Sequence, residues 1–186
     1  MLEIVIQGRG GQGAQTAGNL LASAYFAAGH EVQCFATYGG ARRGTPVSSY
    51  LRVDERPIRV RCNIERADAI LCFDASLLVE PLLGCADANT LIVVNSSRPA
   101  SHFAQALPGL RVLPIDGLAI ARRNGLGRIV NSALVGACAR AVGGIELPVL
   151  GQTIAAGSPA RREENVVACN EGWDETERLL SAEAPR

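Results

Sequence analysis

The hydrophobic positions of this chain fall into short apolar runs that alternate with longer stretches of small or amphipathic residues. The apolar runs predict strands at residues 2–7, 32–36, 47–53, 69–73, 90–94 and 112–115. Helices are predicted at residues 14–28, 76–83, 117–123, 131–142, 147–156 and 159–180. Residues 57–60 are expected to pair with the third strand. The alternation of strands and helices favours an α/β fold, with a mostly parallel sheet and helices on both faces.

The same pattern predicts one Rossmann-like domain spanning residues 1–186, with a helical C-terminal part from about residue 129. Hydrophobic residues make up 48% of the chain and charged residues 19%, which is a normal balance for a globular domain. Composition therefore gives no reason to divide the chain or to expect disorder.

The first strand runs directly into a loop with several glycines, and a helix is predicted to begin immediately afterwards. Gly8, Gly10 and Gly13 satisfy the pattern G-x-G-x-x-G, in which glycines allow a tight turn and a helix N-terminus favours an anion. A dinucleotide-binding fold would also place an acid at the end of the second strand. Residues 33–37 contain none, and Glu31 lies at the opposite end. Three roles for the loop stay open: it binds NAD or FAD independently, it forms a structural turn, or it contacts a ligand shared with another chain. The missing acid weighs against independent binding of NAD or FAD.

A second special loop, Thr-Tyr-Gly-Gly-Ala-Arg-Arg-Gly-Thr-Pro at residues 37–46, follows the second strand. It is expected at the same carboxyl edge of the sheet as the glycine loop, where open α/β sheets bind ligands. Arg42 and Arg43 could hold a phosphate or carboxylate, or pair with acidic groups of a partner. A solvated charged turn is the simpler alternative.

Charge and residue types exclude several classes of protein. The formal net charge is zero, which gives no reason to expect nucleic acid or an anionic membrane as a partner. All 18 basic residues are arginine, so a Schiff-base lysine and a P-loop lysine are both excluded. The start of the chain does not resemble a secretion signal, and no apolar run is long enough to span a membrane. A cytoplasmic location is therefore expected.

No catalytic residues or metal ligands are expected. The six cysteines form no C-x-x-C pair, so we expect this chain to hold no iron–sulfur cluster or zinc of its own. His30 and His102 are isolated, and no Ser–His–Asp or Cys–His arrangement is suggested. Asp74, Asn95 and Asp116 follow predicted strands, and Asp74 is expected to cap the helix after it. The chain has binding loops but no visible catalytic machinery.

The two glycine loops together closely resemble the gamma subunit of the 2-oxoacid:acceptor oxidoreductases, which include the pyruvate and 2-oxoisovalerate ferredoxin oxidoreductases. The resemblance rests on Gly-Arg-Gly-Gly-Gln-Gly-Ala at residues 8–14 and Tyr-Gly-Gly-Ala-Arg-Arg-Gly-Thr-Pro-Val at residues 38–47. Residues 74–78, 91–95 and 131–137 also resemble segments of that family. The likeness covers residues 1 to about 145 and is expected to include the tail.

The resemblance implies a division of labour among subunits. Enzymes of this family decarboxylate a 2-oxoacid on thiamine diphosphate, pass electrons through [4Fe–4S] clusters and transfer the acyl group to coenzyme A. Thiamine diphosphate and Mg²⁺ are expected on alpha and beta subunits, and the clusters on a delta-type subunit. The gamma subunit is expected to hold no cofactor alone, to pack on the alpha–beta core, and to help bind or enclose coenzyme A.

Two sets of residues carry over from the resemblance as candidate contacts to coenzyme A or to a neighbouring subunit. The first loop supplies Gly8, Arg9, Gly10, Gly11, Gln12 and Gly13. The second loop supplies Tyr38, Arg42, Arg43 and Gly44. Many relatives have an acidic residue where this chain has Ala41, which leaves the 2-oxoacid open, including aromatic ones such as phenylglyoxylate or indolepyruvate. An acceptor other than ferredoxin also stays open. So do two rival functions, a free-standing NAD- or FAD-binding oxidoreductase and a purely structural interaction subunit.

Overall fold

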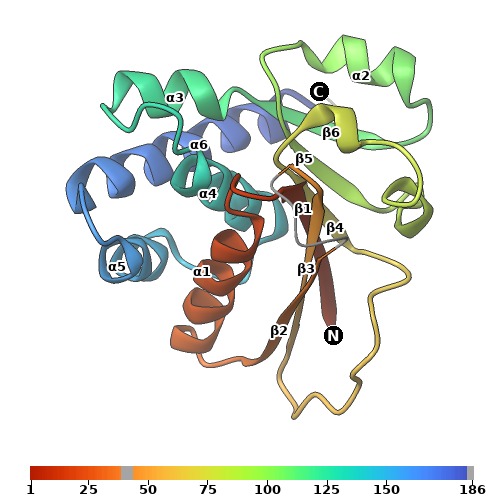
Figure 1. Ribbon diagram of the computed structural model, residues 1–186, viewed down its shortest axis with the longest axis horizontal. Coiled ribbons are helices and arrows are strands. Elements are labelled where there is room, and N and C mark those ends of the chain that lie inside the picture. Colours follow the sequence, from red (N-terminus) through yellow and green to blue (C-terminus); the bar gives the residue numbers. More distant parts are fainter. Residues whose placement is uncertain (39–43, 184–186) are drawn as a thin grey trace.

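The described residues of the chain form one mixed six-stranded sheet in the order β2-β3-β1-β4-β5-β6 (Figure 1). The computed structural model describes residues 1–38 and 44–183, so the predicted site residues Arg42 and Arg43 lie outside the described residues. The strands are β1 (Leu2–Arg9), β2 (Glu31–Tyr38), β3 (Pro46–Asp54), β4 (Ala69–Cys72), β5 (Leu91–Asn95) and β6 (Arg111–Ile115).

Strand directions place the ends of β1 and β2 at the same edge of the sheet. β1, β4, β5 and β6 run parallel, whereas β3 is antiparallel to both β1 and β2. Val47 at the start of β3 is in register with Gly8 on one side and with Tyr38 on the other. The expected meeting of the two loops at the carboxyl edge is therefore confirmed for their described parts.

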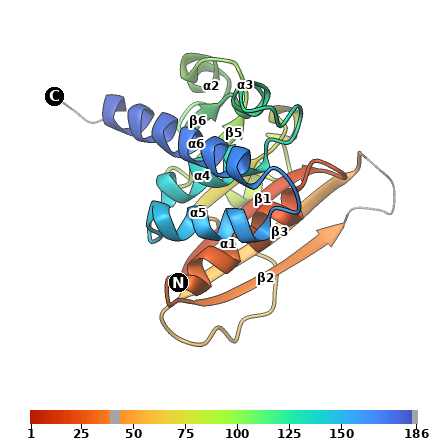
Figure 2. The ribbon, with the colours of Figure 1, turned by 90° about the vertical axis from the view of Figure 1, so that its left-hand side faces the viewer.

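Helices cover the two faces of the sheet unequally (Figures 1 and 2). Helices α1, α3, α4, α5 and α6 bury the larger core on one face. On the other face, α2 and the two 3₁₀ turns η1 and η2 bury a smaller core. The helices are α1 (Ala14–Ala27), α2 (Ala100–Ala106), α3 (Gly117–Arg123), α4 (Asn131–Val142), α5 (Leu147–Gly157) and α6 (Arg162–Glu183), with η1 (Ala75–Leu77) and η2 (Leu83–Cys85). The predicted α/β fold, with a mostly parallel sheet and helices on both faces, is confirmed.

The crossing of α4 and α6 is built around two glycines. A Cβ added at Gly136 would lie 2.0 Å from the backbone oxygen of Cys169. A Cβ added at Gly172 would lie 2.0 Å from the backbone oxygen of Ala133. The two helices therefore approach backbone to backbone, which explains the run of small residues in α4.

Two local predictions were wrong, each for a reason visible in the contacts. Residues 57–60 form no strand; instead the Gln33 side chain donates to the backbone oxygen of Val60 at 2.6 Å. The buried guanidinium of Arg52 binds Glu3 and the backbone oxygen of Cys62, and so anchors this segment by side chains. Residues 76–83 form no α-helix, because Pro81 lacks an amide donor and restricts the residue before it.

Helix α2 was missed because its sequence carries little signal. It spans only Ala100–Ala106, and Phe103 is its only buried residue. A single inward position in seven gives no periodicity to detect. Among the described residues, no helix combines the length and apolarity that crossing a membrane requires.

Candidate functional site

The glycine loop between β1 and α1 is closed by hydrogen bonds between Arg9 and Gln12. The backbone amide of Arg9 donates to Gln12 Oε1 at 2.7 Å, and the backbone amide of Gln12 donates to the Arg9 carbonyl at 2.9 Å. Gly11 and Gly13 adopt φ values of +94° and +92°, which side-chain-bearing residues rarely adopt. Gly13 is the N-cap of α1 and supplies no side chain there, so the first amides of the helix face the loop.

Asp74, in the turn that follows β4, holds this loop in place. Its Oδ2 accepts from Arg9 Nε at 2.8 Å and from Gln12 Nε2 at 3.5 Å. Its Oδ1 accepts from the backbone amide and the hydroxyl of Ser76, which confirms the expected capping role, here of the 3₁₀ turn η1. Arg9 Nη2 also donates to Ser76 Oγ at 2.8 Å. The bridge from β4 to the glycine loop was not anticipated, because nothing local in the sequence indicates it.

The Asp74 carboxylate should make the loop sensitive to acid. Partial burial raises the pKa of Asp74, but hydrogen bonds from Ser76 and from the Arg9 guanidinium outweigh burial and hold this pKa below its ordinary value. The stabilisation that the ionised Asp74 carboxylate gives to the loop is therefore fully present above the pKa of Asp74 in the unfolded chain, about 3.9. It is lost as the pH falls through the lower pKa of Asp74 in the folded chain.

We expect the NMR signal of the Ser76 amide, and with it those of the glycine loop, to shift only below a pH of about 3.9. Asp74→Asn should remove this titration. A transition at or above the ordinary aspartate pKa would contradict the assigned hydrogen bonds.

The described ends of the second loop contact the first. The backbone amide of Gly10 donates to the Thr45 carbonyl at 2.9 Å, and that of Gly44 to the Gly10 carbonyl at 3.4 Å. Arg9 Nη1 donates to the Gly44 carbonyl at 3.3 Å. Tyr38 is 58% exposed, and its hydroxyl donates to Gln15 in the first turn of α1. The structure thus brings together the candidate residues of both loops that it describes.

A pocket of about 590 Å³ opens beside the glycine loop, at the carboxyl ends of β1, β4 and β5. This is the edge at which open α/β sheets bind ligands. Its walls come from the glycine loop, the first turn of α1, the ends of β4 and β5, and the segment that enters α4. The lining residues are Gly11, Gln12, Gly13, Thr16, Phe73, Asn95, Leu118, Arg128, Ile129, Val130 and Asn131.

The electrostatics of this pocket favour an anion. None of its lining residues is Asp or Glu, and Arg128 is exposed at its rim. The N-termini of α1 and α4 both border it, and each presents amides that lack partners within the helix. The two N-termini lie in close contact at Gly13 and Asn131. A Cβ added at Gly13 would lie only 2.3 Å from Asn131 Nδ2, so there is no room for a side chain between them. The arrangement can hold a phosphate or carboxylate, but it offers no evident proton-transfer group.

Sequence reasoning missed the part of this pocket that comes from the far end of the chain. Arg128 and Asn131 were not singled out individually, although residues 131–137 carried part of the family resemblance. The sequence signal that could have indicated these two residues is the polar start of α4, which follows the Gly-Leu-Gly segment at residues 125–127. Asp116 acts locally, because it accepts from the Ala119 amide at 2.9 Å. Asn95 lines the pocket and accepts from the Gly117 amide at 3.1 Å, which ties the end of β5 to the start of α3.

The cysteines do not contribute reactive groups to the pocket. Burial raises the pKa of the Cys72, Cys138 and Cys169 thiols to about 12, so they stay protonated at neutral pH. Within residues 1–38 and 44–183, no three His, Cys, Asp or Glu side chains gather as a metal site would require.

Fold and pocket together define an α/β protein with a glycine loop at the carboxyl edge of a mixed sheet, which differs from a dinucleotide-binding Rossmann domain. In that domain the second strand lies next to the first and ends in the acid that binds ribose. Here β3 separates β2 from β1, and β2 ends in Tyr38.

The chain belongs to the pyruvate ferredoxin/flavodoxin oxidoreductase family, whose model matches residues 3–175. It is 37% identical to the pyruvate/ketoisovalerate oxidoreductases common subunit gamma of Thermococcus kodakarensis, over 95% of this chain and 97% of the relative. The predicted resemblance to gamma subunits is confirmed.

Solved structures agree with the fold. The crystal structure of the pyruvate oxidoreductase subunit PORC of Thermotoga maritima matches with a TM-score of 0.80 and 26% identity, over 93% of this chain and 95% of that chain. The 2-oxoglutarate:ferredoxin oxidoreductase of Magnetococcus marinus matches with a TM-score of 0.74 and 21% identity, over 100% of this chain and 32% of that chain. The latter likeness shows that the same fold also occurs as part of a longer polypeptide.

Proposed function

We propose that this chain is the gamma subunit of a thiamine diphosphate-dependent 2-oxoacid:acceptor oxidoreductase that forms acyl-coenzyme A, with its pocket contacting coenzyme A. Family membership and the gamma-subunit names of similar proteins support the subunit role. Thiamine diphosphate, Mg²⁺ and [4Fe–4S] clusters then belong to alpha, beta and delta-type partners. Ferredoxin is the expected acceptor.

The pocket beside the glycine loop carries the coenzyme A part of the proposal. Coenzyme A is an anionic nucleotide, and this pocket has an arginine, two helix N-termini and no carboxylate among its lining residues. The Magnetococcus marinus structure is described with 2-oxoglutarate, coenzyme A and succinyl-CoA bound. A pocket of about 590 Å³ falls within the range of small-molecule sites, so it could take one portion of coenzyme A while partner subunits enclose the rest.

In this function the chain binds and orients, and the reacting groups lie elsewhere. The Gly10 and Gln12 amides are already bound to carbonyls of the two loops, so the donors for a ligand are the amides of the α1 N-terminus. The Asp74–Arg9 bridge holds the loop before α1 in place in advance. Such preorganised donors hold an anionic ligand without reorganising when it arrives. Arg42 and Arg43 remain candidate donors from the second loop.

Replacing Arg128 by Gln in the assembled enzyme should raise the KM for coenzyme A by about tenfold, because a charge-assisted hydrogen bond contributes about 1.5–3 kcal/mol. The KM for the 2-oxoacid should stay unchanged. Arg123→Gln is the matched control, because this nearby exposed arginine is held by Glu171 on α6 and does not line the pocket. Arg43→Ala should likewise raise the KM for coenzyme A and leave the KM for the 2-oxoacid unchanged. Equal loss on both substrates, or none, would count against the coenzyme A contact.

The two rival functions predict different results. A structural interaction subunit would lose assembly in loop variants, while the complexes that do form would keep normal coenzyme A kinetics. A free-standing oxidoreductase would bind NAD(H), NADP(H) or FAD tightly when the isolated chain is titrated. Either result would replace the proposal.

A further inference from the structure

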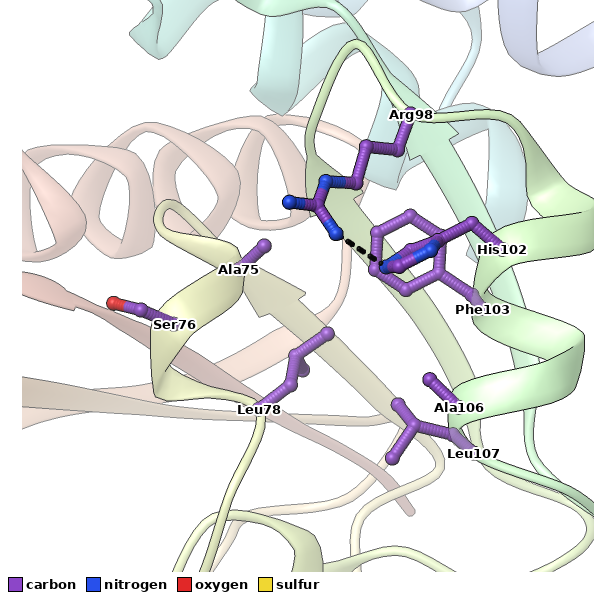
Figure 3. A pocket seen from close by; sticks show the side chains of 8 residues that line it. All are labelled: Ala75, Ser76, Leu78, Arg98, His102, Phe103, Ala106 and Leu107. Carbon is purple, nitrogen blue, oxygen red and sulfur yellow. Dashed lines mark hydrogen bonds between the residues drawn. The ribbon is translucent and has the colours of Figure 1, made fainter.

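A second pocket lies on the opposite face of the sheet, between η1 and α2 (Figure 3). Its volume is about 320 Å³. The apolar part is formed by Leu78, Phe103 and Leu107, and the polar groups of Arg98 and His102 border it. The hydroxyl of Ser76 points away from the pocket and is bound to Asp74 and Arg9. It shares no lining residue with the pocket beside the glycine loop.

The apolar floor of this pocket is part of the smaller core. Leu78 and Phe103 are buried and belong to the cluster that packs on this face of the sheet. Within the described part of the chain, this face is covered by α2, by two short turns and by loops, whereas helices α1, α3, α4, α5 and α6 cover the other face (Figure 1). The layer formed by α2, η1 and η2 therefore leaves a pocket through which a group from another molecule can contact apolar side chains of the smaller core.

The rim of the pocket carries the positive charge of Arg98. Arg98 is exposed, and its Nη1 lies 2.8 Å from His102 Nε2. Because arginine is always a donor, His102 Nε2 accepts this bond. None of the residues that line the pocket is Asp or Glu. The His102 contact fixes the guanidinium over one end of an apolar hollow, so the complementary group is an acid next to an apolar side chain.

We propose that this pocket docks another subunit of the same enzyme, which inserts an apolar side chain against Leu78 and Phe103 and places a neighbouring Asp or Glu on Arg98. A buried apolar anchor beside a charge-assisted hydrogen bond is the usual form of an interface hot spot. This inference rests on the proposed role of the chain as a subunit, but it does not depend on the coenzyme A contact.

The test uses the full chain with the alpha and beta chains of its own enzyme. Arg98→Glu reverses the rim charge, and Ala106→Phe fills the hollow from an exposed position at the end of α2. Each should weaken association with the partner by about tenfold or more, measured by surface plasmon resonance. Arg59→Glu, in the exposed segment between β3 and β4, and Gln105→Phe, exposed on α2 outside the pocket, are the matched controls.

Photo-crosslinking identifies the occupant directly. Benzoylphenylalanine at position 106 should crosslink to a partner peptide in which Asp or Glu adjoins an apolar residue, and benzoylphenylalanine at position 105 should not. If the unaltered chain fails to associate with alpha and beta chains, the subunit role itself fails. If it associates and both pocket variants associate equally well, the docking proposal is overturned. It is also overturned if free isovalerate, titrated into the isolated chain, binds and loses affinity in Arg98→Gln, because the pocket would then serve a small molecule.

Discussion

Gly136→Ala should destabilise the folded chain by about 3 kcal/mol or more, as overpacking between rigid elements does at the upper end of its range. The added methyl group would lie 2.0 Å from the carbonyl oxygen of Cys169, and neither atom belongs to a side chain that can rotate away. The helices α4 and α6 must therefore separate, which opens the larger core along the whole crossing. Urea unfolding followed by circular dichroism measures the loss as a lower midpoint.

The control comes from a neighbouring helix. Gly151 lies within α5, and a Cβ there would meet only Val166 Cγ1 at an ordinary 3.7 Å. Gly151→Ala should therefore be neutral or stabilise by up to about 1 kcal/mol through helix propensity. Gly172→Ala should match Gly136→Ala, and the double variant should cost less than the sum, because both methyl groups separate the same two helices. If Gly136→Ala unfolds at the same urea concentration as the unaltered chain, the backbones of α4 and α6 do not approach as closely as the structure shows.

The strands could be predicted because each carries its own signal. β4 and β5 are central parallel strands buried on both faces, so they read as continuous apolar runs. Segments without such a run were misjudged. The 57–60 segment is held by the side chains of Gln33 and Arg52, and α2 turns only Phe103 inward. Contacts between distant side chains leave no periodicity in the local sequence.

The same limit applies to the candidate site. The glycine loop is visible because its constraints are local, namely a turn, two positive φ angles and a helix start. Arg128 and Asn131 lie beside the glycine loop only because the chain comes back to this edge of the sheet after its sixth strand. Tertiary packing, not local sequence, brings them there. Recognition of the gamma-type segments indicated that residues 131–137 matter, without saying what they touch.

The meeting of the two halves of the pocket predicts the second large effect. Gly13→Ala should raise the KM for coenzyme A in the assembled enzyme by more than tenfold, an effect on the order of 1.4 kcal/mol or more. The new methyl group would occupy the place of the Asn131 amide, 2.3 Å from its Nδ2, and would push that side chain into the pocket or away from it. It would also hold a non-glycine residue at φ +92°, which costs about 1–3 kcal/mol of stability.

Two further variants separate the steric effect from the backbone strain. Gly11 has nearly the same φ, +94°, but a Cβ there meets no atom within 4 Å, so Gly11→Ala carries the strain alone. Gly11→Ala should lower the melting temperature as Gly13→Ala does and change the KM for coenzyme A less. Adding Asn131→Ala to Gly13→Ala removes the colliding amide and should recover part of the affinity, while the stability stays low. If Gly11→Ala and Gly13→Ala raise the KM equally, the junction of the two helix N-termini does not shape the ligand site, and strain in the loop alone accounts for the loss.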